Sequence, residues 1–220
     1  MPPPPLRVML SSTVVGLEDT IEQAAAVLHG YGYDVLSSHL GTIMPRPGQT
    51  VPEACVEAVG RADYLVGIIQ GRYGSAQQGT SGLSDADVSI THLEQRHAAS
   101  LDAPRVFFVD RRVEVARSAL RPVLDRLTPT PVDANGRPVW DLPLASGQPN
   151  PFERSSVLSD LRVLAMLEEA EQGGGGAWVI RTGNWCQRYD RSSQILTSLP
   201  ALFGDPDRLR ADLAAYRATP

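Results

Sequence analysis

The chain has 220 residues, 42% hydrophobic and 20% charged, a composition that is ordinary for a globular protein and excludes a disordered one. Twenty basic against twenty-five acidic residues leave a net charge of −5, so nucleic acid is not expected as a partner. No apolar run approaches the roughly 20 residues that cross a bilayer, so no membrane partner is expected either. With only Cys55 and Cys186, neither a disulfide framework nor a metal site is expected. These features predict a soluble protein of the cytoplasm.

The first elements follow one another in a simple order. Residues 1–5 are almost all proline and predict an extended, disordered lead-in. Residues 7–11 form a short apolar run typical of a buried strand, which continues into the polar Ser11, Ser12 and Thr13. Apolar residues then recur at helical spacing from Leu17 to Leu28, and a second short strand is predicted at Tyr33–Ser37.

The next stretch repeats this alternation. A helix is predicted over 51–62, with Pro52 in its first turn, and the most apolar strand over 64–69. Residues 71–87 predict an exposed loop rich in glycine, serine and glutamine. A third helix over 89–101 and a fourth strand over 105–109 follow.

This alternation predicts an α/β fold: a doubly wound parallel sheet of the flavodoxin-like kind. Right-handed crossovers bring the carboxyl ends of the strands to one edge, where such sheets bind ligands. Ser11–Thr13, Gly71–Gly74 and the start of the third helix should therefore surround one crevice. The strand residues expected to be buried are Val8, Leu10, Leu65, Val66, Ile68, Ile69, Val106, Phe107 and Phe108.

Residues 111–220 predict a C-terminal α+β elaboration that packs on a first domain of residues 6–110. Helices are predicted over 116–127, 157–170 and 205–218, the last with Asp205 as its cap. A hairpin is predicted at 132–140, around Asn135-Gly136, and a strand at 177–181.

Three stretches, in this order, resemble a known family. They are residues 8–13 (VMLSST), residues 62–74 (ADYLVGIIQGRYG), and residues 89–94 (SITHLE) followed by Ala98 and Ala103-Pro104. Together they resemble the family of domains of unknown function numbered 4062, a TIR-like branch related to TIR domains and nucleoside deoxyribosyltransferases. The resemblance covers residues 6–110.

The resemblance implies a function as well as a fold. Active members of the broader group use a carboxylate on the helix before the fourth strand to act on an N-glycosidic bond, and Glu94 occupies that place. The implied activity is a nucleotide N-glycosidase (a hydrolase) that cleaves NAD as a substrate and needs no cofactor, in bacterial signalling or antiviral defence, with self-association or a partner protein. The alternatives are a non-catalytic nucleotide-binding or protein-interaction module, and a salvage glycosidase or transferase.

The position of Glu94 in the sequence is compatible with the catalytic role that the resemblance implies. It lies four residues after Ile90 and four before Ala98, on a stripe of small and apolar side chains. A carboxylate beside a buried stripe is costly unless it is paired or used. It could stabilise, or attack, the oxocarbenium-like centre formed when a ribosyl–base bond breaks. The alternative is a surface glutamate on the flank of the helix that pairs with Arg96 or caps a hydrogen-bond network.

Hydroxyl groups at the first strand–helix junction are candidates for substrate binding. Ser11, Ser12 and Thr13 could hold ribose or phosphate oxygens, although a polar turn explains them equally well. Ser89 is expected to cap the third helix, with substrate contact as the alternative.

Three further candidates are larger side chains. Arg72 could bind a pyrophosphate, and Tyr73 could stack on a base, the alternative for Tyr73 being packing within the turn. His92 could act as an acid or base, but is expected to face solvent. It stands where the family more often has an acidic residue.

Overall fold

The computed structural model describes residues 3–74, 88–124, 155, 157–172 and 184–218. The predicted hairpin at 132–140 and the predicted strand at 177–181 lie outside these residues, as does most of the predicted loop over 71–87. Pro3–Pro5, in the predicted lead-in, are exposed and belong to no helix or strand.

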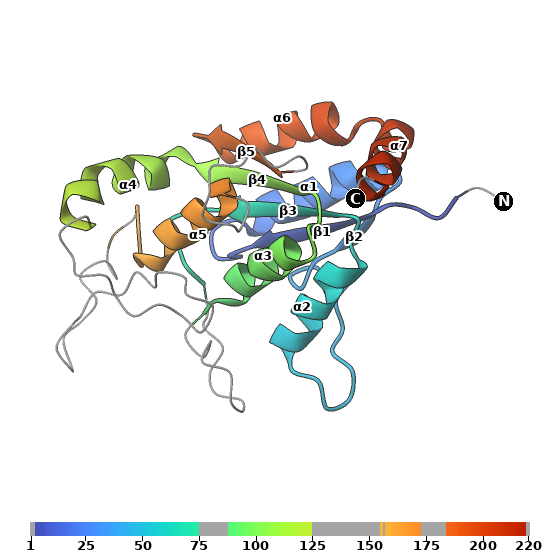
Figure 1. Ribbon diagram of the computed structural model, residues 1–220, viewed down its shortest axis with the longest axis horizontal. Helices are drawn as coiled ribbons and strands as arrows, with labels where there is room; N and C mark the ends of the chain where they lie inside the picture. The colour runs from blue at the N-terminus through green and yellow to red at the C-terminus, as the bar shows by residue number, and fades with distance from the viewer. Residues whose placement is uncertain (1–2, 75–87, 125–154, 156, 173–183, 219–220) are drawn as a thin grey trace.

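A five-stranded parallel sheet forms the centre of the described fold (Figure 1). Its strands are β1 (Arg7–Ser12), β2 (Asp34–Leu36), β3 (Tyr64–Ile69), β4 (Arg105–Asp110) and β5 (Asn184–Tyr189). They lie in the order β2-β1-β3-β4-β5, and every neighbouring pair is parallel. This order confirms the predicted doubly wound α/β fold.

Helices cover both faces of the sheet (Figure 1). One face carries α1 (Glu18–Gly30), α6 (Ser192–Phe203) and α7 (Pro206–Arg217), and the other carries α2 (Val51–Arg61), α3 (Ile90–Ser100) and α5 (Arg162–Gln172). The remaining helix, α4 (Arg111–Leu124), follows β4 directly. The chain crosses to β2 along one face and returns to β3 along the other, so the winding reverses between β1 and β3.

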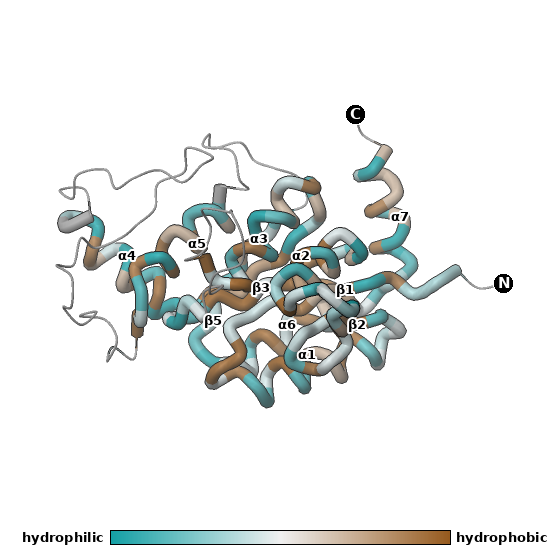
Figure 2. Tube along the Cα trace, turned by 90° about the horizontal axis from the view of Figure 1, so that it is seen from below, coloured by the Kyte–Doolittle hydropathy of each residue, from teal (hydrophilic) through white to brown (hydrophobic). Residues whose placement is uncertain are grey.

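Alternate side chains of the strands enter two separate hydrophobic clusters, because successive residues of a strand point to opposite faces. Leu65 and Phe107 pack under α2, α3 and α5, whereas Val66 and Phe108 pack under α1 and α6. Figure 2 shows hydrophobic residues gathered at the central strand β3 and hydrophilic ones on outward turns of the helices.

All but one of the strand residues expected to be buried are buried. The exception is Val106, which is half-buried on β4 beside β5. Its register partner on β5 is the exposed Trp185, so less of the core covers this position.

The second half of the chain completes the sheet and both clusters. β5 pairs with β4 along its whole length, and residues of α5 and α6 fill the two clusters. Neither β5 nor α6 was predicted from the sequence, and the predicted helix over 157–170 begins later, at Arg162. β5 was missed because Asn184, Gln187 and Arg188 interrupt its apolar pattern.

Candidate functional site

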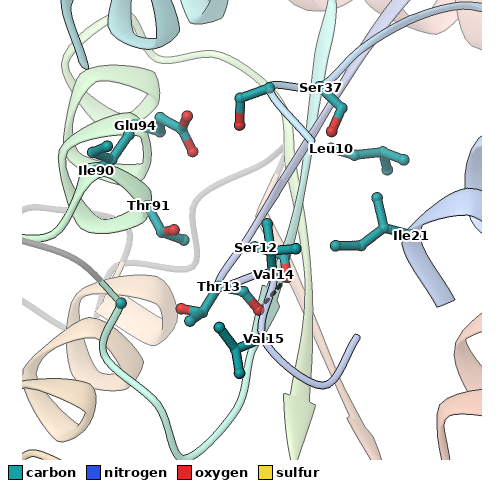
Figure 3. A pocket seen from close by; sticks show the side chains of 12 residues that line it. Leu10, Ser12, Thr13, Val14, Val15, Ile21, Ser37, Ile90, Thr91 and Glu94 are labelled. Atoms are coloured by element: carbon teal, nitrogen blue, oxygen red, sulfur yellow. Dashed lines mark hydrogen bonds between the residues drawn. The ribbon is translucent and has the colours of Figure 1, made fainter. Parts of the chain in front are cut away.

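A cavity of about 190 Å³ lies where the winding reverses, beyond the carboxyl ends of β1 and β2 (Figure 3). Ligands of doubly wound sheets bind at this kind of position. Its described lining residues come from the ends of β1 and β2, the start of α1, the turn after β3 and the first turns of α3: Leu10, Ser12, Thr13, Val14, Val15, Ile21, Ser37, Ser38, Gly74, Ile90, Thr91 and Glu94.

Glu94 reaches the cavity from the face of α3 that meets the sheet (Figure 3). The hydroxyl of Ser11, on β1, donates a hydrogen bond to Glu94 Oε2. Glu94 is 4% exposed and Ser11 is 3% exposed. Ser11 and Glu94 therefore lie together at one edge of the sheet, as predicted.

Burial raises the pKa of the Glu94 carboxyl to about 7, although hydrogen bonds from the Ser11 hydroxyl and the Cys55 thiol act in the opposite direction. Burial, together with the nearby charge of Glu94, also raises the pKa of Cys55 to about 12. Glu94 is the only ionisable side chain among the described lining residues, and Lys, Arg and His are absent from that set. The carboxyl is thus buried at a cavity whose described lining residues include no cation.

The opposite face of α3 fixes the helix to α5. Gln95 Nε2 donates to the carbonyl of Met166 at 2.8 Å. Arg96 binds Glu169 through two hydrogen bonds, of 3.0 and 2.8 Å. The alternative in which Glu94 is a surface residue paired with Arg96 is therefore wrong, because Arg96 is paired with Glu169 on the other side of the helix.

His92 does not face solvent, contrary to expectation. It is 1% exposed, its Nδ1 lies 2.8 Å from the Tyr73 hydroxyl, and its Nε2 lies 3.1 Å from Glu169 Oε2. It lies on the side of α3 that faces α5, together with Gln95 and Arg96. The residues of α5 that Gln95 and Arg96 contact come some seventy positions later in the sequence. His92 is not among the residues lining the cavity, so it is not placed to exchange a proton there.

The same cluster controls the ionisation of Glu169. Burial alone would raise its pKa, but hydrogen bonds from His92 and Arg96 outweigh burial and lower the pKa to about 2. Tyr73 closes the cluster: it is buried, and the guanidinium of Arg162 lies 4.5 Å from the centre of its ring. Tyr73 therefore packs inside the protein, the alternative weighed for it, and is not among the residues lining the cavity.

The other predicted binding residues divide into two groups. Ser12 and Thr13 line the cavity, and Thr13 Oγ1 donates to the carbonyl of Arg72 at 3.1 Å. The Arg72 side chain is exposed and is not among the lining residues, so the structure does not bring it to Glu94. Ser89 caps α3, as expected, by accepting a 3.3 Å hydrogen bond from the His92 amide.

Several residues of the candidate site were not predicted from the sequence. Ser37 and Ser38 follow β2 at the same sheet edge, so the rule that selected Ser11–Thr13 could have found them. Cys55 lies on the buried side of α2, beside Glu94, and was considered in the sequence only as a possible disulfide or metal residue. Gln70 orders the cavity wall by donating to the carbonyls of Thr13 and Val15, at 3.0 and 2.9 Å.

The fold and the site define a doubly wound α/β protein with a buried carboxyl group at its switch point. The family model described as "Domain of unknown function (DUF4062)" matches residues 7–124, more than half of the 220 residues. The chain belongs to this family, as the resemblance predicted. A comparison with curated proteins found no match.

Two further findings concern what the described residues can bind or span. Within the described residues, no group of three or more His, Cys, Asp or Glu side chains could hold a metal ion. None of the helices in the described ranges is both long and apolar enough to cross a membrane.

Proposed function

We propose that this protein cleaves the N-glycosidic bond of a nucleoside or nucleotide, with Glu94 acting at the anomeric carbon. One observation carries the proposal: the buried Glu94 carboxyl opens into a cavity at the switch point, hydrogen-bonded to Ser11 and with no cation among the described lining residues. A buried carboxylate that pairs with a cation is structural, whereas this one has its charge available to a ligand.

The chemistry follows from that available charge. As the bond between the anomeric carbon and the base nitrogen breaks, the bonding electrons leave with the base and positive charge develops on the sugar. An ionised Glu94 would stabilise that charge or form an ester with the anomeric carbon, which water would then hydrolyse. Low local polarity strengthens this interaction, because little solvent competes with the carboxylate.

The hydroxyl groups around Glu94 have complementary roles in the proposal. Ser11 orients the carboxyl through its hydrogen bond. Ser12, Ser37 and Thr91 line the cavity and can exchange hydrogen bonds with sugar hydroxyls. NAD remains the substrate predicted by the resemblance, and bacterial signalling or defence remains the predicted setting.

A binding module without catalysis is the rival interpretation, and the two differ in what Glu94 does. The test is to incubate the purified protein with NAD and a panel of nucleosides and nucleotides, and to separate the products by chromatography. The proposal expects a free base and the corresponding sugar product with the wild type, and neither with Glu94→Gln. Binding without release of a base from any member of the panel would contradict the proposal. The protein would then be interpreted as a binding module.

Self-association is a separate prediction of the resemblance. Light scattering over a range of protein concentrations tests it directly. A strict monomer at every concentration, with and without ligand, would show that the site works within one chain.

A further inference from the structure

We infer that the cavity beside Glu94 takes a nucleoside without phosphate, in preference to a nucleoside phosphate or a dinucleotide. The inference rests on the proposed function, since both use Glu94 and its cavity, but it concerns which ligands the site accepts. Four features of the described residues support it: the charge of the lining, the start of α1, the position of the basic side chains, and the size and polarity of the cavity.

The lining has one ionisable group, and that group is acidic. The other described lining residues carry hydroxyl groups, aliphatic side chains or, at Gly74, no side chain. A phosphate enclosed here would meet the Glu94 carboxyl without a cation from the described lining to offset its charge. Burying an unpaired charge is costly, so phosphate should weaken binding.

The start of α1 carries two of the protein's own carboxylates. Helix N-termini commonly bind phosphate through their free N–H groups. Here α1 begins at Glu18, whose Oε2 accepts the Gly16 amide at 2.8 Å, and Asp19 adds a second negative charge in the first turn. This end of the helix, which follows the lining residues Val14 and Val15, therefore disfavours an anion.

The basic side chains near this edge have other positions or partners. Arg72 is exposed and is not among the lining residues. His39, next to the lining residue Ser38, lies 3.7 Å from the Glu22 carboxylate.

The cavity is small and has two kinds of wall (Figure 3). Its volume of about 190 Å³ is below the roughly 300 Å³ at which pockets for drug-sized ligands begin. Thr91 and Glu94 line it from α3, whereas Leu10 and Ile21 form an apolar wall across from them. This arrangement offers hydroxyl and carboxyl groups to a sugar on one side and aliphatic side chains to a base on the other.

The test compares ligands that share one glycosidic bond and differ in phosphate: nicotinamide riboside, nicotinamide mononucleotide and NAD. Nicotinamide release gives kcat/KM for each, and calorimetry compares the binding of adenosine and AMP. We expect kcat/KM for the riboside to be at least about tenfold higher than for either phosphorylated substrate. We also expect adenosine to bind at least about tenfold more tightly than AMP. Equal or better use of NAD, tighter binding of AMP, or no binding of any probe would overturn the inference.

Two variants make the cause of the preference testable. Glu94→Gln removes the negative charge from the cavity and should reduce the difference in affinity between adenosine and AMP. Asp207→Asn, an exposed residue in the first turn of α7, removes a charge elsewhere and should leave it unchanged. An adenosine preference that Glu94→Gln does not narrow would contradict the charge argument.

The outcomes also separate this inference from the proposed function. Cleavage of NAD in preference to the riboside would overturn the inference and leave the proposed function standing. A preference for adenosine over AMP without release of any base would leave the inference standing and contradict the proposed function.

Discussion

Ser11 on β1 donates a hydrogen bond to Glu94 on α3, although the two residues are 83 positions apart in the sequence. Both side chains are buried, so little water competes for either group. The bond joins the end of a central strand to the first turns of a helix that α5 holds from its other side. It therefore orients the carboxyl group and opposes part of the rise in pKa that burial causes.

Ser11→Ala should raise the pKa of Glu94 above its present value of about 7. The Ser11 hydroxyl donates to the ionised form and lowers this pKa, so its loss leaves burial less opposed. A pH titration of the glutamate side-chain carbons by NMR measures the shift.

Ser12→Ala is the matched control, because the Ser12 hydroxyl donates to the carbonyl of Thr13 and not to Glu94. Its titration should follow that of the wild type. Equal Glu94 titrations in the wild type and Ser11→Ala would contradict the prediction.

Glu94→Gln should change how stability depends on pH. The native pKa of about 7 lies above the ordinary glutamate pKa of 4.5, so between these two pH values the native state binds more protons than the unfolded state. The stabilisation from the neutral carboxyl is thus fully present below pH 4.5 and is lost as pH rises towards 7. Since Gln cannot ionise, the variant should gain about 3 kcal/mol relative to the wild type between pH 4.5 and 8.

Urea unfolding of both proteins at several pH values gives this difference directly. The contributions of groups such as Glu169 are common to both proteins and cancel in the comparison. A difference in unfolding free energy that stays constant with pH would show that Glu94 titrates normally.

Gly74→Ala should impair ligand binding as well as stability. Gly74 has a φ of +89°, and an added Cβ would lie 3.3 Å from Thr13 Oγ1 at the cavity wall. The backbone strain should cost about 1–2 kcal/mol. Gly16→Ala is the control, since Gly16 has a φ of +85° but an added Cβ would meet nothing within 4 Å.

Both variants should therefore lose similar stability in thermal unfolding. Only Gly74→Ala should also weaken adenosine binding measured by calorimetry. Equal adenosine affinity in the two variants would mean that the turn after β3 does not shape the site.

Much of this fold could be predicted, because strands such as β3 are short, apolar and separated by helical repeats. The parallel topology alone predicted that Ser11 and Glu94 lie at the same edge of the sheet. The environment of His92 could not be predicted, since its partners Tyr73 and Glu169 come from a turn and a distant helix. The prediction that Arg72 belongs to the site was wrong for a similar reason. Arg72 follows β3 at the expected edge of the sheet, but nothing in the sequence indicates where its side chain points.

Tyr73→Phe should destabilise the protein by about 1–3 kcal/mol without altering the cavity. The substitution removes the hydroxyl that lies 2.8 Å from His92 Nδ1 in a buried cluster, and a buried polar atom that loses its partner is costly. Thermal unfolding measures the loss, and Tyr31→Phe, at an exposed tyrosine, is the control. A Tyr73→Phe protein as stable as the control would show that the bond contributes little.

The most direct test of the central claim is the rate of base release by Glu94→Gln on the best substrate of the wild type. The variant keeps the shape of the side chain but loses the charge that faces the developing cation. We expect kcat/KM to fall by roughly two to four decades, or about 3–5 kcal/mol, with native stability retained. Glu22→Gln, at an exposed carboxylate of α1, should keep wild-type activity. A folded Glu94→Gln protein that retains more than roughly a tenth of the wild-type rate would contradict the claim that Glu94 performs the chemistry.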